Sequence, residues 1–311
     1  MDWYKISLQL AAPTPTPWHA DTLFGHLCWA LAHTEGAGLL DDFLGLYGLD
    51  APPLVLSNGF PGDLLPRPLL AARAQTAVAD LTAERAAFRR GKEARRAVWL
   101  SPAEFERARR GEPLQPAPSK PFAARVTMHN RINRLTGTTG EEASLFALAA
   151  EGLAEAGGHI TVYALVDPGF VACLRRCLAY LALNGYGKRK SVGYGALAQA
   201  TLEPFAGFAP LAEANGFIAL SNFVPAAGDP TQGAWQTLVK RGKLGEDYAT
   251  AGDPFKRPVL MLRAGACFYD RSPRPYYGRL VAGVHHDFPQ VVQYGLALAV
   301  SASLPASEVA A

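Results

Sequence analysis

Residues 159–204 carry the pattern that most restricts the fold. "HITVYALVD" is rich in β-branched and aromatic residues and predicts a strand over 159–167. "PGFVACLRRCLAYLALNG" begins at Pro168 and ends at Gly185, the residues typical of a helix start and end, and predicts a helix over 168–185. "GALAQATLEPF" then predicts another strand. A helix joined so closely to two strands must pack on the sheet that contains them.

The N-terminal part repeats this arrangement. "WYKISLQL" predicts a strand over 3–10, and "HADTLFGHLCWALAHTEG" predicts a helix from about 20 to 34, which Asp21 or Thr22 can cap. "PLVLSNGFPGD" predicts the next strand. The order strand, helix, strands, helix, strand is that of a ferredoxin-like βαββαβ domain of the α+β class, spanning 1–204.

A large insertion, at about 67–135, interrupts this domain. Residues 70–110 are rich in Ala and Arg and predict helices, broken at Ser101-Pro102, where the serine is a suitable cap. "RVTMHNRINRLTG" alternates and ends in a turn, which predicts one arm of a β-hairpin.

Charge is concentrated in the insertion. The chain carries a net charge of +3, but the segment 67–134 holds fifteen Lys and Arg against six acids, which leaves the rest acidic. This asymmetry predicts that the insertion faces a polyanion.

A short internal repeat suggests a second half. "LSNGFP" at 56–61 and "LSNFVP" at 220–225 share Leu-Ser-Asn-x-x-Pro, each after an apolar strand. The repeat is short enough to arise by chance. If it is real, a second ferredoxin-like half lies within 205–311, with "FIALSNFVP", "PVLMLRAGACFY" and "VVQYGLALAV" as strands.

The segment "NGYGKRKSVGYG" at 184–195 contains the first candidate site, the glycine loop (185–195). It lacks the spacing of a Walker A loop, and it follows a helix and opens a strand, the reverse of a dinucleotide-binding loop. The alternatives are a solvated turn or an anion site, and the four flanking glycines and the basic insertion favour RNA. The candidate residues are Gly185, Gly187, Lys188, Arg189, Lys190, Ser191, Gly193 and Gly195.

The segment "HNRINR" at 129–134 is the second candidate. On a strand, His129, Arg131 and Asn133 would share one face, with Asn130, Ile132 and Arg134 on the other. Imidazole, guanidinium and amide groups can stack on and hydrogen-bond to unpaired bases. The alternative is an exposed hairpin with ordinary polar residues.

Other chemical candidates are weaker. His19, His26 and His33 would share a helix face, but about 10 Å apart along the axis, too far to act on one phosphate. "HHD" at 285–287 lacks further ligands for a metal, and Cys173 and Cys177, one turn apart, are typical of helix packing. We therefore expect no metal or cofactor.

Apolar runs, the N-terminal segment and the cysteine count indicate the cellular compartment. No apolar run reaches the ~20 residues of a membrane span. The N-terminus shows no signal peptide, and four cysteines do not make a disulfide framework. We expect a cytoplasmic protein.

These segments together carry a resemblance. "ADTLFGHLCWAL", "LVLSNGFP", "HNRINRLTG…SLFAL", "GYGKRKSVGYG" and "VVQYGLALAV" resemble, in order and spacing, the RAMP superfamily of CRISPR-associated proteins. More narrowly, they resemble the 5′-handle-binding subunit of the type III-A (Csm) effector complex. The resemblance implies tandem ferredoxin-like (RRM-like) RAMP domains.

The resemblance also implies a function and partners. Such a subunit is non-catalytic and caps the 5′ repeat-derived handle of crRNA. It meets the large polymerase-like signature subunit and the adjacent backbone RAMP subunit, and target RNA only indirectly. The glycine loop would contact handle phosphates, the helix start at Asp21, Thr22 and Gly25 would lie beside it, and the hairpin at His129, Asn130, Arg131, Asn133 and Arg134 would lie near the handle–guide junction.

The sequence departs from the family in two places. Ala20 stands where the family commonly has Ser, which puts only a hydroxyl contact in doubt. The Arg-rich stretch 85–110 is the part that resembles the family least, and RNA contact there rests on charge alone. Two other functions stay open. One is a RAMP endoribonuclease that processes the repeat with His19 or His26 as base, and the other is a scaffold whose insertion binds an acidic protein.

Overall fold

The computed structural model describes residues 1–70, 97–114, 119–139, 145–155, 157–250 and 252–305. In the first half, the strands are β1 Asp2–Leu10, β2 Leu54–Pro61, β3 Leu65–Pro66, β4 Trp99–Leu100, β5 Phe122–Asn130, β6 Leu145–Leu153, β7 His159–Val166 and β8 Leu197–Pro204. The helices are α1 Ala20–Glu35, α2 Ala37–Gly48, α4 Pro102–Arg109 and α5 Val171–Asn184, with short 3-10 turns η1 Pro168–Phe170 and η2 Lys190–Val192. No helix of the described residues is long and apolar enough to cross a membrane.

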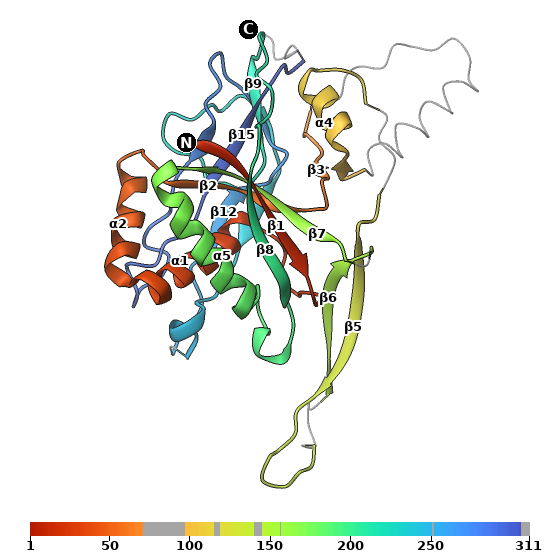
Figure 1. Cartoon of the computed structure of the whole chain (residues 1–311), viewed down its shortest axis with the longest axis vertical. Coiled ribbons are helices and arrows are strands. Elements are labelled where there is room, and N and C mark those ends of the chain that lie inside the picture. The colour runs from red at the N-terminus through yellow and green to blue at the C-terminus, as the bar shows by residue number, and fades with distance from the viewer. Residues whose placement is uncertain (71–96, 115–118, 140–144, 156, 251, 306–311) are drawn as a thin grey trace, which may run out of the picture.

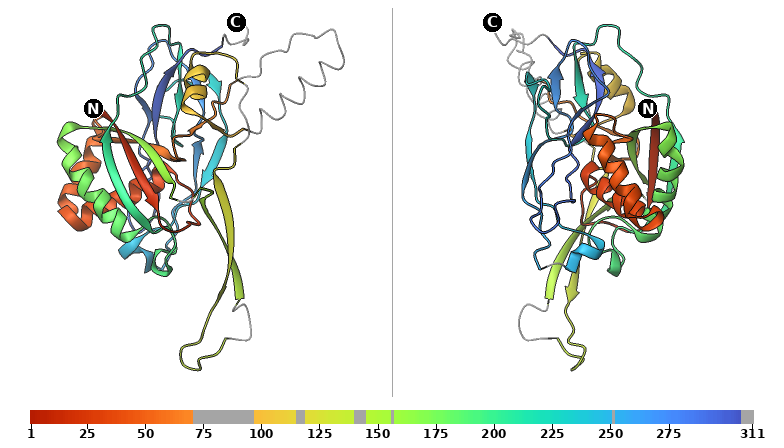
Figure 2. Two further views of the ribbon diagram at one scale, coloured as in Figure 1. Left: turned by 45° about the vertical axis from the view of Figure 1, so that its right-hand side comes forward. Right: turned by 90° about the vertical axis from the view of Figure 1, so that its left-hand side faces the viewer.

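The first sheet has the order β2-β7-β1-β8, and every neighbouring pair is antiparallel. Helices α1 and α5 pack against each other on one face of it (Figures 1 and 2). The predicted order of strand, helix, strand, strand, helix, strand is confirmed, with the insertion between β2 and β7.

The second half consists of strands and turns. Its elements are β9 Gly216–Ala219, β10 Gly233–Ala234, β11 Thr237–Lys240, η3 Glu246–Thr250, β12 Val259–Leu262, β13 Cys267–Tyr269, β14 Tyr276–Gly278 and β15 Leu296–Ala302. A five-stranded sheet has the order β10-β13-β9-β15-β14, and β11 pairs with β12. Residues 205–250 and 252–305 form no α-helix, so the helices expected of a ferredoxin-like unit are present only in the first half.

Two segments differ from the prediction. "PVLMLRAGACFY" forms β12 and β13 in separate sheets, because the chain turns between them at Gly265, which has φ +91°. Trp99 and Leu100 form β4 against β3 rather than part of a helix, whereas α4 begins with the predicted Ser101 cap and its reciprocal Glu104 bond. The helices expected over 71–96 lie outside the described residues.

The hairpin of β5 and β6 projects from the body of the molecule (Figure 1). His129 pairs with Phe146, and the strand ends at Asn130. The predicted alternation therefore fails beyond Asn130: Asn133 accepts from Leu135 N through its side chain and from Gly137 N through its carbonyl, and so folds the tip into a turn.

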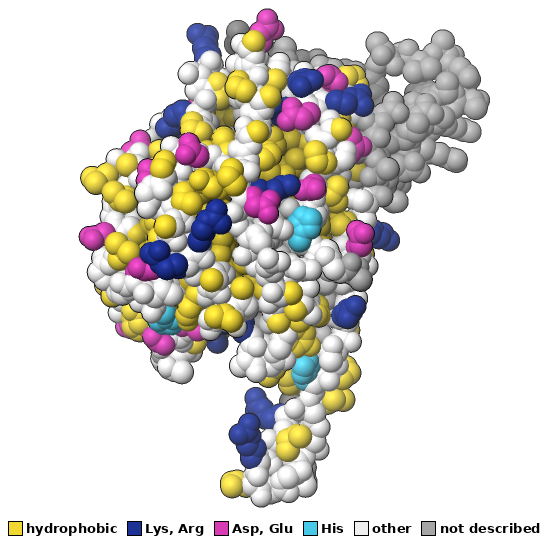
Figure 3. All heavy atoms as spheres, viewed as in Figure 1, with side chains coloured by type: hydrophobic (Ala, Val, Ile, Leu, Met, Phe, Trp, Pro, Cys, Tyr) yellow, Lys and Arg dark blue, Asp and Glu magenta, His cyan; other side chains and the backbone are white. Residues whose placement is uncertain are grey.

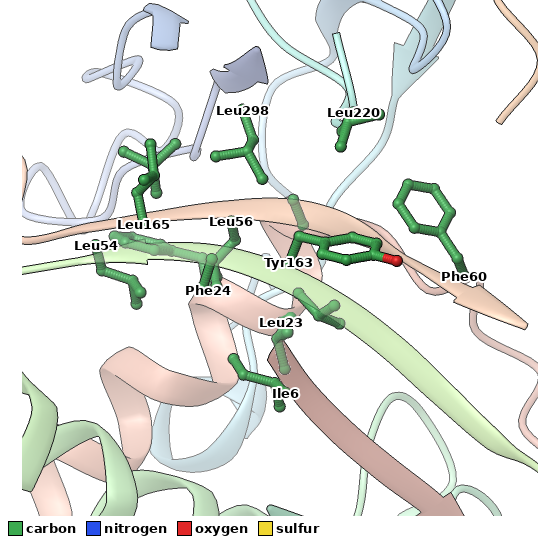
Figure 4. Packing of buried hydrophobic residues seen from close by; sticks show 14 of the residues in the cluster. Ile6, Leu23, Phe24, Leu54, Leu56, Phe60, Tyr163, Leu165, Leu220 and Leu298 are labelled. Atoms are coloured by element: carbon green, nitrogen blue, oxygen red, sulfur yellow. The ribbon is translucent and has the colours of Figure 1, made fainter. Parts of the chain in front are cut away.

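One hydrophobic core joins the two halves. Leu54, Leu56 and Leu165 of the first sheet pack with Leu220 and Leu298 of the second half (Figure 4). Tyr294 adds a polar link, because its hydroxyl accepts a hydrogen bond from Leu56 N at 2.8 Å.

The Leu-Ser-Asn repeat has a structural counterpart. Ser57 Oγ accepts from Tyr163 N at the β2 bulge, and Ser221 Oγ accepts from Leu298 N, so each serine bonds to the neighbouring strand. The two segments also meet, because Asn58 N donates to Leu220 O at 2.9 Å.

The start of α1 is capped by the same repeat. The N-cap position is His19, which makes no side-chain cap, and neither Asp21 nor Thr22 serves as the expected cap. Asn58 Oδ1 instead accepts from Ala20 N at 2.9 Å. A side chain distant in sequence supplies this cap, so local sequence could not show it.

Candidate nucleic-acid interface

The glycine loop needs its glycines for backbone geometry. Gly185, Gly187, Gly193 and Gly195 all have positive φ, and Gly185 ends α5. A Cβ at Gly195 would lie 1.9 Å from Tyr186 O, whereas one at Gly193 would meet no atom within 4 Å. Gly195 therefore must be glycine because Tyr186 O lies too close for a side chain, whereas Gly193 is favoured only by its positive φ.

The first amides of the loop bond within the protein. Gly187 N donates to His26 Nε2 and Lys188 N donates to Thr16 Oγ1, both at 2.9 Å. Tyr186 stacks on Trp18, with 3.9 Å between ring centroids, and its hydroxyl donates to Pro17 O. These bonds hold the loop against the segment 13–18 and leave the amides of Gly187 and Lys188 engaged, so a phosphate would have to be bound by other groups.

Those other groups lie in the middle of the loop. Lys188, Arg189 and Ser191 are exposed, and the first amides of η2 have no intrahelical acceptor by their position. Lys190 is half-buried and pairs with Glu246 of the second half. Burial raises the pKa of Glu246, but the hydrogen bond and charge of Lys190 outweigh it and hold that pKa below the usual value. Lys190 therefore connects the halves.

The loop meets the hairpin. The His129 ring is within hydrogen-bond distance of the Tyr194 hydroxyl, with 2.8 Å between Nε2 and Oη. His129 stacks on Phe146 at 5.5 Å, and the Arg189 guanidinium lies 5.3 Å from the same Phe146 ring. The structure thus brings together two candidate segments whose joined residues are 65 positions apart in the chain.

Phe146 and Tyr194 are members of this junction that the sequence analysis missed. The signal for Phe146 lies in the hairpin register, because it is the residue opposite His129. Tyr194 lies between Gly193 and Gly195, and nothing in the sequence next to it indicates a partner for its ring.

The remaining hairpin candidates lie away from the junction. Asn130, Arg131, Asn133 and Arg134 are exposed near or within the tip. Figure 3 shows basic side chains on this projecting end. The structure therefore separates His129, at the loop, from the arginines of the tip.

The helix start is closed by an ion pair. Asp21 is buried, and its carboxylate accepts from Lys240 Nζ at 2.8 Å and from Gln293 Nε2 at 2.6 Å. Thr22 Oγ1 accepts from the same Lys240 Nζ at 3.0 Å. Gly25 is half-exposed, and a Cβ added to it would meet no atom within 4 Å. Asp21 and Thr22 thus bind the second half of the chain.

Both candidate histidines are engaged. Burial, and then Lys240, lower the pKa of His19 to about 4, and its Nδ1 lies 3.3 Å from Lys240 Nζ. Burial, and then Lys190, lower the pKa of His26 to about 4, and its Nε2 accepts from Gly187 N. The free electron pair a general base needs is thus occupied at His26 in this arrangement.

The other candidate clusters have structural partners. His285, His286 and Asp287 lie close enough to share an ion, but His285 Nε2 contacts Asp253 O and its Nδ1 accepts from Asp287 N, so both its nitrogens are occupied. Cys173 and Cys177 are buried in the core, as expected of helix packing.

Part of the described basic charge of the insertion is neutralised by ion pairs on and beside α4. Arg107 pairs with Glu112 at 3.2 Å, and Arg109 pairs with Glu106 at 2.9 Å. Arg109 is fully buried and also donates to Ser301 O and Ala209 O. The stretch 71–96, with much of the remaining charge, lies outside the described residues.

Comparisons with known proteins were made at three levels. No family model matches the chain, and the search of curated proteins found no relative. Among solved structures, a chain of the Csm1–Csm4 cassette in complex with AMPPNP matches with a TM-score of 0.63 and 18% identity, over 98% of this chain and 100% of that one.

Two further structures agree. A chain of the same cassette in complex with pppApA gives a TM-score of 0.62 at 19% identity, covering 98% and 100% of the two chains. A chain of the Csm3–Csm4 subcomplex in the type III-A CRISPR-Cas interference complex gives 0.61 at 11% identity, again covering 98% and 100%. The chain thus shares the mixed helix and strand fold of these chains over nearly its whole length.

Proposed function

We propose that this chain is the Csm4-type subunit of a type III-A CRISPR effector complex and binds the 5′ handle of crRNA without cutting it. The similar structures support the placement, because Csm4 is the component that the names of both complexes share. Two halves of RAMP type would form the subunit. In each sheet, the strand that comes last of three in the chain lies between the other two: β7 lies between β1 and β2, and β15 lies between β9 and β14.

The junction of the glycine loop and the hairpin is the observation that carries RNA binding. Arg189, Phe146 and His129 form a stacked group with a cation at its edge, beside the exposed Lys188. Single-stranded RNA is bound by this combination of cations for phosphates and rings for bases. The amides of Lys190 and Ser191, at the start of η2, add donors for one phosphate, whereas Val192 N is bonded to Arg189 O.

The partners follow from the same proposal. The large signature subunit and a backbone RAMP subunit would adjoin this chain, as Csm1 and Csm3 are named with Csm4 in the similar structures. Target RNA would be reached only through the crRNA, and the complex would act in the cytoplasm.

A salt titration tests the RNA site. The variant Lys188→Ala/Arg189→Ala removes both exposed cations and keeps the Lys190–Glu246 pair. We expect weaker binding of handle RNA and a salt slope lower by about 0.7 for each phosphate that the variant no longer binds. The control is Arg175→Ala/Arg271→Ala, which removes two exposed charges elsewhere. Equal slopes for the loop variant and the parent would show that the loop does not contact phosphate.

A cleavage assay tests the non-catalytic role. Purified protein is incubated with labelled repeat RNA without metal, and we expect the RNA to stay intact, because His26 and His19 are both engaged. Specific cleavage by the parent that His19→Ala abolishes would instead assign this chain to the RAMP endoribonucleases.

A further inference from the structure

The ribbon of β11 and β12 has one face attached to the body and one face in solvent. Four residue pairs join the strands, from Thr237–Leu262 to Lys240–Val259. On the inner face, Met261 is buried and Lys240 bonds to Asp21 at the start of α1. This attachment fixes which way the other face points.

The exposure of the side chains alternates from Thr237 to Leu244 and defines the outer face. Trp235, Thr237, Val239, Arg241 and Lys243 are all exposed, while the even-numbered residues from Leu238 to Leu244 are half-buried or buried. Only Thr237–Lys240 of this row are in β11, so at about 3.3 Å per residue the row from Trp235 to Lys243 is at most about 26 Å long. On β12, Leu260 is 59% exposed. Phe255 lies four residues before β12, where it forms an isolated bridge with Lys243, and is 63% exposed.

Charge on this face has one sign. Arg241 and Lys243 lie in the row and are both exposed. None of the residues of the outer face just named is acidic. Of the acids close to these residues in the sequence, Glu246 pairs with Lys190, and Asp253 accepts a hydrogen bond from Phe255 N at 3.0 Å. Such a row complements a polyanion better than a neutral apolar partner.

Aromatic rings lie at both ends of the row. Trp235 stacks one face on Phe268 at 5.3 Å and is 46% exposed, so its other face is open. Phe255 is exposed with Lys243 Nζ 5.9 Å from its ring centroid. Open rings among cations are how proteins bind unpaired nucleotides, because bases stack on the rings while cations contact phosphates.

The ribbon is also close to the glycine loop. Lys243 lies three residues before Glu246, which pairs with Lys190 of the loop. Three residues span at most about 11 Å, so Lys243 lies within a short reach of that pair. Figure 1 shows β12 behind the first sheet, and Figure 2 gives the side view.

We infer that the outer face of the β11–β12 ribbon is a second RNA-binding surface, which takes unpaired nucleotides continuous with the RNA bound at the glycine loop. This inference rests on the proposed function. The ligand is single-stranded RNA: Trp235 and Phe255 stack on bases, and Arg241 and Lys243 bind the phosphates between them. The ribbon thus lengthens the bound segment.

The test uses the full chain and two ribbon variants, Arg241→Ala/Lys243→Ala and Trp235→Ala. The probes are oligouridylates of increasing length, from about 4 to 16 nucleotides, the range of a single-strand site. The charge variant should lower the salt slope by about 0.7 for each phosphate that it no longer binds. Trp235→Ala should weaken binding of the longer probes about 5- to 150-fold. Both should leave binding of the shortest probe, held at the loop, unchanged.

The control Arg175→Ala/Arg271→Ala separates these effects from a general reduction in positive charge. If the loop variant loses binding while both ribbon variants match the parent at every length, the ribbon inference is overturned and the proposed function stands. If the parent binds handle RNA but none of these probes, the ribbon inference is overturned and the proposed function stands; if it binds neither, both fail. If the ribbon variants bind RNA normally but bind an acidic polypeptide such as polyglutamate more weakly than the parent does, the surface serves a protein and the inference is also overturned.

Discussion

At the scale of single residues, close approach decides which loop positions tolerate change. Gly193 and Gly195 both have positive φ, but only Gly195 is pressed against Tyr186 O. The sequence shows four similar glycines, and nothing local distinguishes them. The distinction comes from Tyr186, whose ring is held by Trp18 and whose carbonyl lies over Gly195.

The pair Gly195→Ala and Gly193→Ala measures this difference. Gly193→Ala should cost about 1–2 kcal/mol of stability from its left-handed conformation alone. Gly195→Ala adds a clash with backbone and should cost more, and it should also weaken RNA binding by displacing Arg189. Urea unfolding and a binding titration measure both. Equal losses for the two variants would contradict the assigned geometry.

Acid sensitivity is also a residue-scale property. The pKa of His26 is lowered to about 4 by burial, from an ordinary value of about 6.5. Below pH 6.5 the unfolded chain therefore binds a proton that the folded chain does not, and stability falls as the pH drops from about 6.5 to 4.

The variant His26→Gln keeps an acceptor for Gly187 N but cannot titrate. We expect it to reduce the loss of stability between pH 7 and pH 4 by up to about 3 kcal/mol, the equivalent of the pKa difference. Urea unfolding at both pH values measures this. His286→Gln is the control, because His286 is exposed. If the free energy of unfolding depended on pH in the same way in the parent and in His26→Gln, the acid sensitivity would not come from His26.

At the scale of elements, the start of α1 shows why the sequence could not assign every candidate. The helix itself was predictable from its apolar spacing. Its capping by Asn58 and the Asp21–Lys240 pair involve residues far apart in the chain. Asp21 and Thr22 resemble a polar helix start from their sequence, but Lys240 lies against both.

Breaking that ion pair should destabilise the protein. Lys240→Met leaves the buried Asp21 carboxylate with only Gln293, and removing one partner of a buried pair costs about 3–5 kcal/mol. Lys240→Met/Asp21→Asn should cost less than the sum of the single changes. Calorimetry on the four proteins gives the coupling energy. Additive costs would contradict the pairing.

At the scale of the whole molecule, local patterns predicted the first half well and the second half poorly. Long segments with clear periodicity, such as 159–204, formed the expected elements. The strands of the second half are mostly two to four residues long, too short for periodicity to detect. The segment "WQTLVKRGK" shows no regular alternation of apolar and polar residues, and only the structure shows that Leu238, Lys240 and Leu244 are more buried than their odd-numbered neighbours.

The tip of the projecting hairpin should contribute to RNA binding but not to the stability of the fold. Asn130 pairs with Leu145, so residues 131–144 can be replaced by Asn-Gly, which closes a two-residue turn. Because 131–139 are exposed, we expect the same unfolding midpoint as the parent and weaker binding of handle RNA. A large drop in midpoint would mean that the tip supports the fold.

The position of β15 has a consequence for synthesis. This last strand lies between β9 and β14, and its Leu298 covers Leu56 and Leu165 of the first sheet. At roughly 5–20 residues per second, a ribosome needs several to about 20 seconds to make the chain beyond β8. During that interval the nascent first sheet has an uncovered apolar face. The protein therefore depends on whatever shields that face on the ribosome, and slow codons after β8 would lengthen its exposure.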